Sequence, residues 1–318
     1  MIVIRLRQDG NLEESFGNGG VRLIPNRLGT SKEEVRAARE TENDGNGPST
    51  AQSNGGFSAA EDPNGKIVLV SNFTRHQRAV ALRLNSDGST DQSFNGGVVI
   101  VELQGVEHLW TSARGVAVQE DGKVLVCGQY GDDTHRAVFV MRFDTEGRVD
   151  TTFNLNRPVT ITSSEYIDFR SIHVSKTAIL VAGEASRDGV NHGLIVVLNT
   201  SGSYNLVFNK GAPLFSKLMS GSMFWRQCAL QSNGSIVVVG VGGELGSRDR
   251  SVVTARYRTD GSLDSTFNNG KGFAVYESEI GTLVSDDMVV MEDGRIVICA
   301  FWMDTNIRFG GWVLRYLG

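Results

Sequence analysis

The sequence has few cysteines and lacks long apolar runs. Its three cysteines, Cys127, Cys228 and Cys299, each lie within an apolar run, which predicts buried reduced thiols rather than disulfides or metal ligands. No apolar stretch approaches the roughly 20 residues of a membrane-spanning helix. The opening residues, MIVIRLRQDG, show neither the long apolar segment nor the cleavage site of a signal peptide. We therefore expect no membrane span, and the cellular location stays open.

The charge balance and the missing motifs exclude further classes. The chain has 31 Lys and Arg residues against 36 Asp and Glu residues, a formal net charge of −5, and no run rich in Lys or Arg. Nucleic acid is bound by basic surfaces, so we expect no nucleic-acid partner. No His, Cys and carboxylate cluster has metal-ligand spacing, and no nucleophile motif is present, so we expect neither a metal nor a cofactor.

What the sequence does contain is an internal repeat. Five times a glycine is followed six residues later by a phenylalanine, in the pairs Gly10/Phe16, Gly88/Phe94, Gly147/Phe153, Gly202/Phe208 and Gly261/Phe267. Three of the four steps between successive glycines span 55 to 59 residues. A repeat of this length is one supersecondary unit, which buries its apolar face only by stacking on its copies.

The apolar pattern inside each repeat predicts strands. Short β-branched runs with period two are bounded by Gly, Asn and Asp, and Asn-Gly or Asp-Gly dipeptides suit tight hairpins. In the second unit the expected strands are Val98–Glu102, Gly115–Gln119, Lys123–Gly128 and Ala137–Phe143. Four antiparallel strands repeated at this period predict an all-β fold, a five-bladed β-propeller forming one domain over residues 1–318, with each repeated Phe between adjacent blades.

Two segments do not fit a simple array. The chain begins and ends with the same kind of strand, Ile2–Leu6 and Trp312–Leu317, so one strand is left over from five quartets. Residues 25–56 form an insertion, in which Ser31 and Glu34 make a capping box that favours a short helix near Ser31–Arg39. The polar composition of the rest of the insertion is typical of a loop.

One repeated block has a family resemblance. The pattern D-G-x-L-D-x-x-F, best matched at Asp260–Phe267, and the run V-A-V-Q-x-D-G-K-V-L-V, matched at Val116–Val126, resemble the bacterial delta-60 repeat. The resemblance breaks at Ser201–Asn205, where both acids are absent. It implies a bacterial β-propeller-like module without an assigned reaction, often part of surface or secreted multi-repeat proteins, with a binding or adhesive role.

The meander of each blade indicates which face binds a ligand. Connections between the first and second strands and between the third and fourth emerge on one face, and these connections vary along the chain. Aromatic side chains in them can stack on sugar rings or anchor a protein partner, although burial between blades is the alternative. These candidate ligand-binding aromatic residues are Trp110, Tyr130, Tyr166, Phe224, Trp225 and Trp302.

Three arginines complete the candidate site. Arg114, Arg170 and Arg226 occupy equivalent positions just before the expected second strand, and Asp286 takes that place in the last repeat. Around a central channel they can hold a carboxylate, a sulfate or an acidic sugar through bidentate hydrogen bonds. Salt bridges between blades are the alternative use.

Three function classes remain after these exclusions. The first is a non-catalytic binding module, lectin-like or adhesive, whose partner is a glycan or a protein surface. The second is a scaffold for one protein partner. The third is a glycoside hydrolase, which needs two carboxylates about 5 to 9.5 Å apart across the site. Because the channel positions offer mainly arginines, the sequence predicts the non-enzymatic module and leaves its ligand and oligomeric state open.

Overall fold

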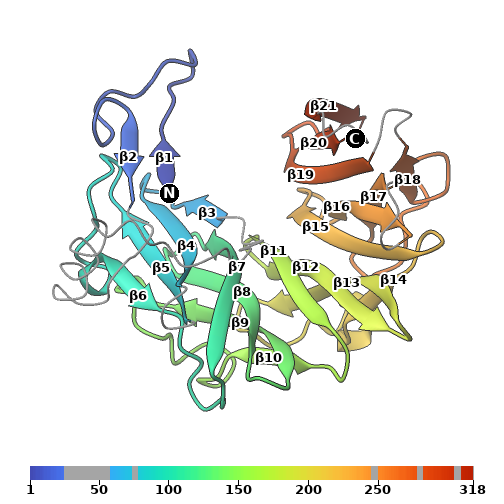
Figure 1. Cartoon of the computed structure of the whole chain (residues 1–318), viewed down its shortest axis with the longest axis horizontal. Helices are drawn as coiled ribbons and strands as arrows, with labels where there is room; N and C mark the ends of the chain where they lie inside the picture. Colours follow the sequence, from blue (N-terminus) through green and yellow to red (C-terminus); the bar gives the residue numbers. More distant parts are fainter. Residues whose placement is uncertain (25–57, 74–77, 245–249, 278–281, 304–308, 318) are drawn as a thin grey trace, which may run out of the picture. The chain divides into compact units, whose positions relative to one another are not determined.

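The protein is built from antiparallel sheets. The computed structural model describes residues 1–24, 58–73, 78–244, 250–277, 282–303 and 309–317. Within them the strands form six sheets (Figure 1). Packing divides the chain into two units, residues 1–126 with 141–150 and residues 127–140 with 151–318. The insertion predicted at residues 25–56, with its helix near Ser31–Arg39, falls outside the described residues.

The first unit contains a two-stranded and a four-stranded sheet. β1 (Ile2–Ile4) pairs with β2 (Val21–Leu23). The strands of the four-stranded sheet follow one another in chain order and are β3 (Ser58–Glu61), β4 (Ile67–Phe73), β5 (Arg78–Leu84) and β6 (Val98–Ile100).

The division between the units passes through the next sheet. Its strands again follow chain order and are β7 (Trp110–Val118), β8 (Val124–Gly131), β9 (Arg136–Phe143) and β10 (Val159–Thr162). In the first unit, β7 packs against β3, β4 and β5.

The second unit continues the same plan. One sheet consists of β11 (Ile167–Val174), β12 (Ala178–Arg187), β13 (Val190–Asn199) and β14 (Leu214–Ser216). The next consists of β15 (Ser222–Leu230), β16 (Ile236–Gly243), β17 (Ser251–Tyr257) and β18 (Phe273–Tyr276). A three-stranded sheet follows, with β19 (Thr282–Val290), β20 (Ile296–Met303) and β21 (Phe309–Tyr316).

The order of strands corrects the predicted blade boundaries. The sequence places Val98–Glu102 at the start of a blade, but β6 pairs with β5 and is the fourth strand of the preceding sheet. The repeated connector, residues 85–97 in this copy, therefore joins the third and fourth strands of one sheet. A bridge between Leu84 and Thr90 turns the chain back along its own sheet, and an equivalent bridge occurs in all five connectors.

This shift explains the leftover strand. β1 precedes a repeated connector and pairs with the strand after it, as β5 pairs with β6, and β21 is the third strand of its sheet, so both are strands of the kind that a connector follows. The prediction of an all-β fold with four-stranded antiparallel sheets is confirmed. The count of five blades is not confirmed, because the described residues form four sheets of four strands, one of three and one of two.

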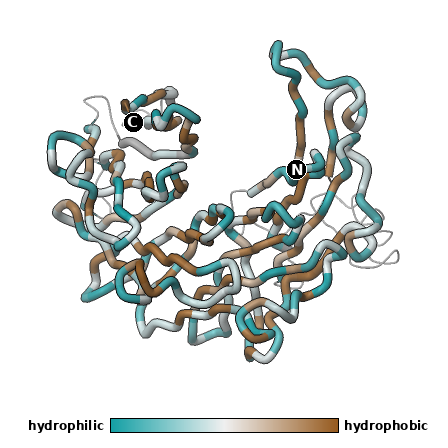
Figure 2. Tube along the Cα trace, turned by 180° about the vertical axis from the view of Figure 1, so that it is seen from behind, coloured by the Kyte–Doolittle hydropathy of each residue, from teal (hydrophilic) through white to brown (hydrophobic). Residues whose placement is uncertain are grey.

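Apolar residues are frequent along the strands, while polar residues concentrate in the turns (Figure 2). In the second unit, one core cluster joins the sheet of β11–β14 to that of β15–β18 and includes Leu180, Val238 and Trp225. Another joins β15–β18 to β19–β21 through Val239, Phe267 and other residues. Within the described part of the chain, no helix is long and apolar enough to cross a membrane.

The cysteine prediction is correct at two of three positions. Cys127 and Cys228 are buried, and burial raises the pKa of the Cys228 thiol to about 12. Cys299 is exposed, as are Val289 and Val313 on the neighbouring strands, because this face of the last sheet is not covered by another sheet among the described residues. An apolar run therefore did not guarantee burial there.

The repeated glycine and phenylalanine contact each other across successive repeats. Each repeat's Phe is buried and lies under the connector glycine of the next repeat, in the pairs Phe16–Gly88, Phe94–Gly147, Phe153–Gly202 and Phe208–Gly261. A methyl group added to Gly202 would lie 2.8 Å from Phe153 Cε2. Glycine is therefore required twice, for its positive φ of 92° and for the approach of the preceding Phe.

Replacing Gly202 with alanine is expected to lower the free energy of unfolding by about 2–4 kcal/mol, combining left-handed strain with overpacking. Gly10 is the matched control, because its φ is 82° but no atom lies within 4 Å of an added methyl group. Gly10→Ala should cost only about 1–2 kcal/mol. Denaturant unfolding of both variants measures the difference, and equal losses would show that the Phe contact contributes nothing.

Candidate functional site: a buried charged cluster in the second unit

Two carboxylates face each other on neighbouring strands of the second unit. Asp168 on β11 is the register partner of Glu184 on β12, so their side chains lie on the same face of the sheet. Asp168 is 0% exposed and Glu184 4%. Buried carboxylates are tolerated only when they are paired and hydrogen-bonded. The structure supplies that partner.

Arg170 joins both carboxylates. Its Nε lies 3.0 Å from Asp168 Oδ2, and its Nη2 donates to Glu184 Oε1 at 2.8 Å. Burial by itself would lower the pKa of Arg170, but the charges of Asp168 and Glu184 outweigh it and raise that pKa. The guanidinium group therefore remains charged.

A β-bulge places Arg170 in this position. The register between β11 and β12 shifts between Phe169 and Ser171, which makes Arg170 the extra residue of the bulge. Gly183 on β12 lets the strands approach, since a methyl group there would lie 2.0 Å from the Asp168 carbonyl oxygen.

Tyr166 and Asn191 complete the cluster. The Tyr166 hydroxyl lies 3.3 Å from Arg170 Nη2 and 3.4 Å from Asp168 Oδ2, at the long end of hydrogen-bond distances. Asn191 Nδ2 donates to Glu184 Oε2 at 2.9 Å. Both carboxylates thus have donors within the second unit, and Tyr166 is the half-buried polar group beside them.

Arg226 adds a positive charge to this region. The register of β15 and β16 shifts between Trp225 and Gln227, so Arg226 is the bulge residue of the next sheet. Its Nε is buried and has no hydrogen-bond partner among the described residues. Burial, followed by repulsion from Arg170, lowers the pKa of Arg226. Its guanidinium carbon lies 5.3 Å from the centre of the Phe224 ring.

The charges around Arg226 do not cancel. Among the described residues, the charged groups that act on Arg226 are the guanidinium groups of Arg170 and Arg250 and the carboxylates of Asp168 and Glu184, so with Arg226 itself there are three positive charges against two negative ones. Because Arg170 and Asn191 already bind the carboxylates, an added anion would find Arg226 available in the described region.

The structure brings four of the predicted site residues into one region, namely Tyr166, Arg170, Phe224 and Arg226. They lie in or beside strands rather than in long loops, which corrects the predicted placement. The strand that comes first in each of these sheets begins earlier than the sequence predicts. β7, for example, starts at Trp110 rather than at Gly115. In β11 and β15 a bulge shifts the alternation of apolar and polar residues within the strand.

The remaining predicted residues lie elsewhere. Trp225 is 0% exposed and belongs to the core of the second unit, where Gly193 leaves room for its indole ring. Tyr130 on β8 is buried and packs edge-on against Phe139, with ring centres 6.4 Å apart. Trp302 on β20 is partly buried against the last core cluster. Their predicted role in ligand binding stays a prediction.

Arg114 and Trp110 lie on β7 in the first unit. The backbone register of β19 shifts between Ser285 and Asp287, so Asp286 is at the equivalent bulge position of the last sheet. The side chain of Asp286 is outside the described residues. The recurrence noticed in the sequence is thus a repeated β-bulge in β11, β15 and β19.

Sequence reasoning missed Asp168, Glu184 and Asn191. A signal was present, because Glu184 interrupts the apolar run ILVAGEA and Asp168 lies two residues before the noted arginine. A charged residue within a buried strand is itself evidence of a partner. The arginine recurrence alone could not identify that partner, since Glu184 lies 14 residues away in the chain.

The acidic residues of the connectors are used structurally. Asp91 Oδ2 accepts from Arg83 Nε at 2.6 Å and from Lys66 Nζ at 2.8 Å, while its other oxygen accepts from Ser93. Burial would raise the pKa of Asp91, but these hydrogen bonds outweigh it and hold that pKa below its usual range. Asp91 therefore caps its own turn as well as pairing with two basic side chains.

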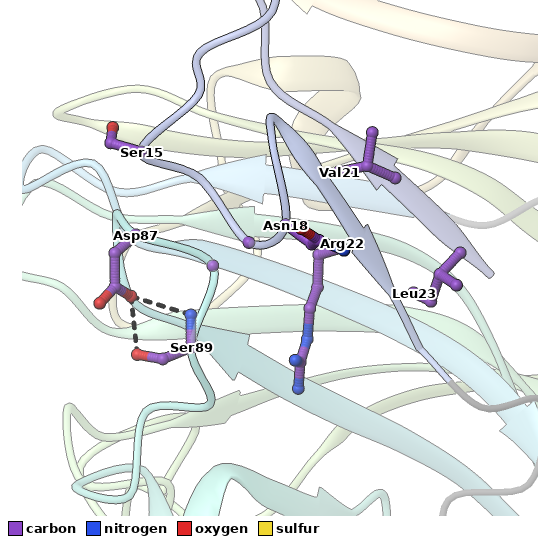
Figure 3. A pocket seen from close by; sticks show the side chains of 9 residues that line it. Ser15, Asn18, Val21, Arg22, Leu23, Asp87 and Ser89 are labelled. Carbon is purple, nitrogen blue, oxygen red and sulfur yellow. Dashed lines mark hydrogen bonds between the residues drawn. The ribbon is translucent and has the colours of Figure 1, made fainter.

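A pocket of about 550 Å³ in the first unit adjoins the same connector. Figure 3 shows its lining, with Asp87 bonded to Ser89 and Arg22 extending from β2. Asp87 Oδ1 accepts from the Ser89 backbone N–H at 2.8 Å and from its hydroxyl at 2.7 Å. Because this carboxylate already caps a turn, we place the candidate site in the second unit. Among the described residues, no group of three or more His, Cys, Asp or Glu side chains could hold a metal ion.

Comparison with known families supports the repeat architecture. Residues 63–94, 119–153 and 231–267 match the family described as "Domain of unknown function (DUF5122) beta-propeller". All three matched segments end at or beside a repeated connector. The chain is therefore an all-β, β-propeller-like repeat protein, and the narrower delta-60 name is not confirmed. A comparison with curated proteins finds no match.

Several solved structures are similar to the chain. Hydrazine synthase of Kuenenia stuttgartiensis is 16% identical with a TM-score of 0.48, over 86% of this chain and 65% of that one. A GH93 α-L-arabinofuranosidase of Fusarium graminearum is 11% identical with a TM-score of 0.49, over 80% and 79%. A gluconolactonase of Xanthomonas campestris is 14% identical with a TM-score of 0.41, over 80% and 74%.

The expectation of a non-enzymatic lectin-like or adhesive protein has no counterpart among these three structures, which are all enzymes, and it is not retained. That prediction counted mainly arginines at the site, with Asp286 from the last repeat, whereas Asp168 and Glu184 lie beside Arg170. The identities are low, so the likeness concerns the fold and transfers no particular reaction.

Proposed function

We propose that this protein is an enzyme that acts on an acidic sugar at the charged cluster of the second unit. Arg226 binds the carboxylate of the substrate, and Tyr166 exchanges a proton with the sugar. The observation that carries the proposal is the buried Arg226 Nε, which has no hydrogen-bond partner among the described residues. The neighbouring carboxylates of Asp168 and Glu184 already pair with Arg170.

An anionic ligand suits Arg226 for an electrostatic reason. A buried guanidinium group without an acceptor is unfavourable, and repulsion from Arg170 and Arg250 adds to the cost. A carboxylate can accept two parallel hydrogen bonds from an arginine and neutralise the surplus charge. Phe224 beside Arg226 offers an apolar face of the kind against which sugar rings stack.

Tyr166 is suited to proton transfer by its two neighbours. The Arg170 guanidinium group at 3.3 Å stabilises a phenolate, and the Asp168 carboxylate at 3.4 Å attracts the hydroxyl proton. When Arg226 binds the substrate carboxylate, negative charge that develops beside that carboxylate is stabilised. The reaction class we propose is therefore β-elimination from a polyuronate: the Tyr166 phenolate takes the proton on the carbon next to the carboxylate, the electron pair of that bond forms a double bond to the neighbouring carbon, and the glycosidic oxygen on that neighbour leaves and takes up a proton from water.

Three further assignments belong to this proposal. The recurrence of the connectors supports these assignments, which are that the repeats are delta-60 repeats, that the propeller has five blades and that residues 1–318 form a single domain. A glycan as the natural partner follows from the acidic sugar proposed here.

Binding of D-glucuronate tests the proposal, with D-glucose as the uncharged control. We expect glucuronate to bind by calorimetry and to raise Tm, and glucose to do neither. Arg226→Gln should weaken glucuronate binding by about 10- to 100-fold, the value of a charge-assisted hydrogen bond. Tyr166→Phe should keep binding but lower turnover of a polyuronate by at least about 100-fold.

Lys210→Gln is the matched charge control, because Lys210 is exposed and lies in the connector turn rather than on β11, β12 or β15. It should leave binding and Tm unchanged. Equal binding of glucose and glucuronate, or full glucuronate affinity in Arg226→Gln, would contradict the anion site. Binding without any turnover would contradict the enzymatic part alone.

A further inference from the structure

A pocket of about 590 Å³ lies in the second unit between the sheet of β11–β14 and that of β15–β18. It is lined by residues of the turns and strand ends, including Val197, Asn205, Gln231 and Thr259. It shares no lining residue with the charged cluster. Its volume is within the range of small-molecule sites.

The pocket coincides with the place where the repeat loses an ion pair. In three copies an arginine of the third strand pairs with a connector aspartate eight residues later, as in Arg83–Asp91 at 2.6 Å and Arg256–Asp264 at 2.7 Å. The equivalent positions in this copy are Val197 and Asn205. The backbone is unchanged, because the N–H of Asn205 still donates to the Val197 carbonyl at 3.0 Å, as that of Asp91 does to Arg83 at 2.9 Å.

In the first unit, this arginine fills the space between two sheets. Arg83 Nη2 donates to the carbonyl oxygen of Thr145 on the next repeat at 2.8 Å. Thr259 holds the position of Thr145, two residues before its connector glycine. Val197 has no group that reaches so far. The volume that a guanidinium side chain would occupy is therefore open, and Thr259 lines it.

A buried acceptor in the pocket lacks a donor. Gln231 is only 9% exposed, and its Nε2 donates to the Gly294 carbonyl at 2.9 Å. Its Oε1 has no partner among the described residues. The equivalent Gln119 accepts through the same oxygen from Arg142 Nη1, an arginine of its own sheet, at 3.0 Å. The corresponding arginine in the sheet of Gln231 is Arg256, which pairs with Asp264 and leaves Gln231 Oε1 without a donor among the described residues. An unsatisfied buried oxygen is costly, so a ligand that donates to Gln231 is favoured.

The charge of the lining selects the kind of donor. None of the described residues that line the pocket is acidic, and the cation among them, Lys176, is exposed. A cationic ligand would lose water without gaining a counter-ion, and an anionic ligand would be repelled by the acceptor oxygen Gln231 Oε1. Ala178, Val197 and Ile236 supply apolar walls.

We infer that this pocket is a second ligand site, which binds a small neutral molecule with a hydrogen-bond-donating amide, urea or hydroxyl head and a short apolar body. The head donates to Gln231 Oε1 and to the Thr259 carbonyl, and the body lies against Val197. The ligand takes the place of the arginine side chain that the other repeats provide.

Butylurea is the probe, compared with the isosteric cation butylguanidinium and the anion pentanoate by saturation-transfer NMR and by titration of the whole chain. We expect saturable binding of butylurea and at least about tenfold weaker binding of the other two. Equal or tighter binding of butylguanidinium or pentanoate would overturn the neutral class, and absence of saturable butylurea binding would overturn the site.

The double variant Val197→Arg/Asn205→Asp restores the repeated ion pair and fills the pocket. It should lose butylurea binding and keep or raise Tm. Gln231→Leu is the second variant, which removes the acceptor without filling the space and should weaken butylurea by about tenfold. Asn64→Ala, in the equivalent turn of an earlier sheet, is the control and should bind butylurea as the wild type does. Unchanged binding in both pocket variants would refute the inference.

Discussion

Replacing Arg170 with methionine is expected to lower the free energy of unfolding of the second unit by about 3–5 kcal/mol. Arg170 is the partner that Asp168 and Glu184 share, at 3.0 Å and 2.8 Å. Methionine keeps the apolar stem but leaves two facing carboxylates buried without their counter-ion. Their mutual repulsion and lost hydration act together, so we expect a loss at the upper end of this range.

Guanidinium chloride unfolding monitored by tryptophan fluorescence measures this loss, since Trp225 lies in the core of the same unit. The sign of the pH effect follows from the charges. Unpaired buried carboxylates are relieved by protonation, so the deficit of Arg170→Met should shrink from pH 7 to pH 4. A triple variant that adds Asp168→Asn and Glu184→Gln should recover most of the stability. If the single variant is as stable as the wild type at pH 7, the cluster is not the buried ion group described above.

Replacing Phe208 with alanine is expected to cost about 3–5 kcal/mol of stability. Phe208 is 1% exposed, belongs to the core cluster between the sheets of β11–β14 and β15–β18, and lies under Gly261 of the next repeat. Truncation removes the ring and leaves a cavity that two rigid sheets cannot close. The same Phe recurs in every repeat, so this position reports on how successive sheets are held together.

The neighbouring Leu206 is the control, because it is also a large apolar residue of the connector but is 78% exposed. Leu206→Ala should change the free energy of unfolding by no more than about 0.5 kcal/mol. Urea unfolding of both variants under the same conditions measures the contrast. Comparable losses in the two variants would mean that the connector stabilises the fold by its backbone turn alone.

Much of the local structure was readable from the sequence. The Asn-Gly and Asp-Gly dipeptides predicted the hairpins, and glycines such as Gly122 do adopt positive φ there. The acidic connector residues cap turns, and Asp87 and Asp260 each accept a hydrogen bond from the backbone N–H two residues further on. These features depend on neighbours within a few residues, so short-range chemistry is sufficient to predict them.

The blade boundaries were not readable in the same way. The sequence does not say whether the strand after a connector pairs with the strand before it or with the strand after it. Only the observed pairing of Val80 with Ile100 assigns β6 to the sheet of β5. The β-bulges could not be predicted from the sequence pattern for a related reason. An extra residue in a strand shifts the alternation of apolar and polar residues. The sequence pattern therefore placed Arg170 and Arg226 before the strands in which the structure places them.

By itself, the sequence determined the repeat, its turns and the apolar strands, because each depends on a periodic pattern or on the conformational preference of a residue such as glycine. Only the tertiary structure decided which charges meet. Three different strands contribute the charged cluster of Asp168, Arg170, Glu184 and Arg226. The pocket beside Val197 lies between two sheets, at the position where other repeats have an arginine side chain. Contacts between distant segments depend on how sheets pack, and that information is not local.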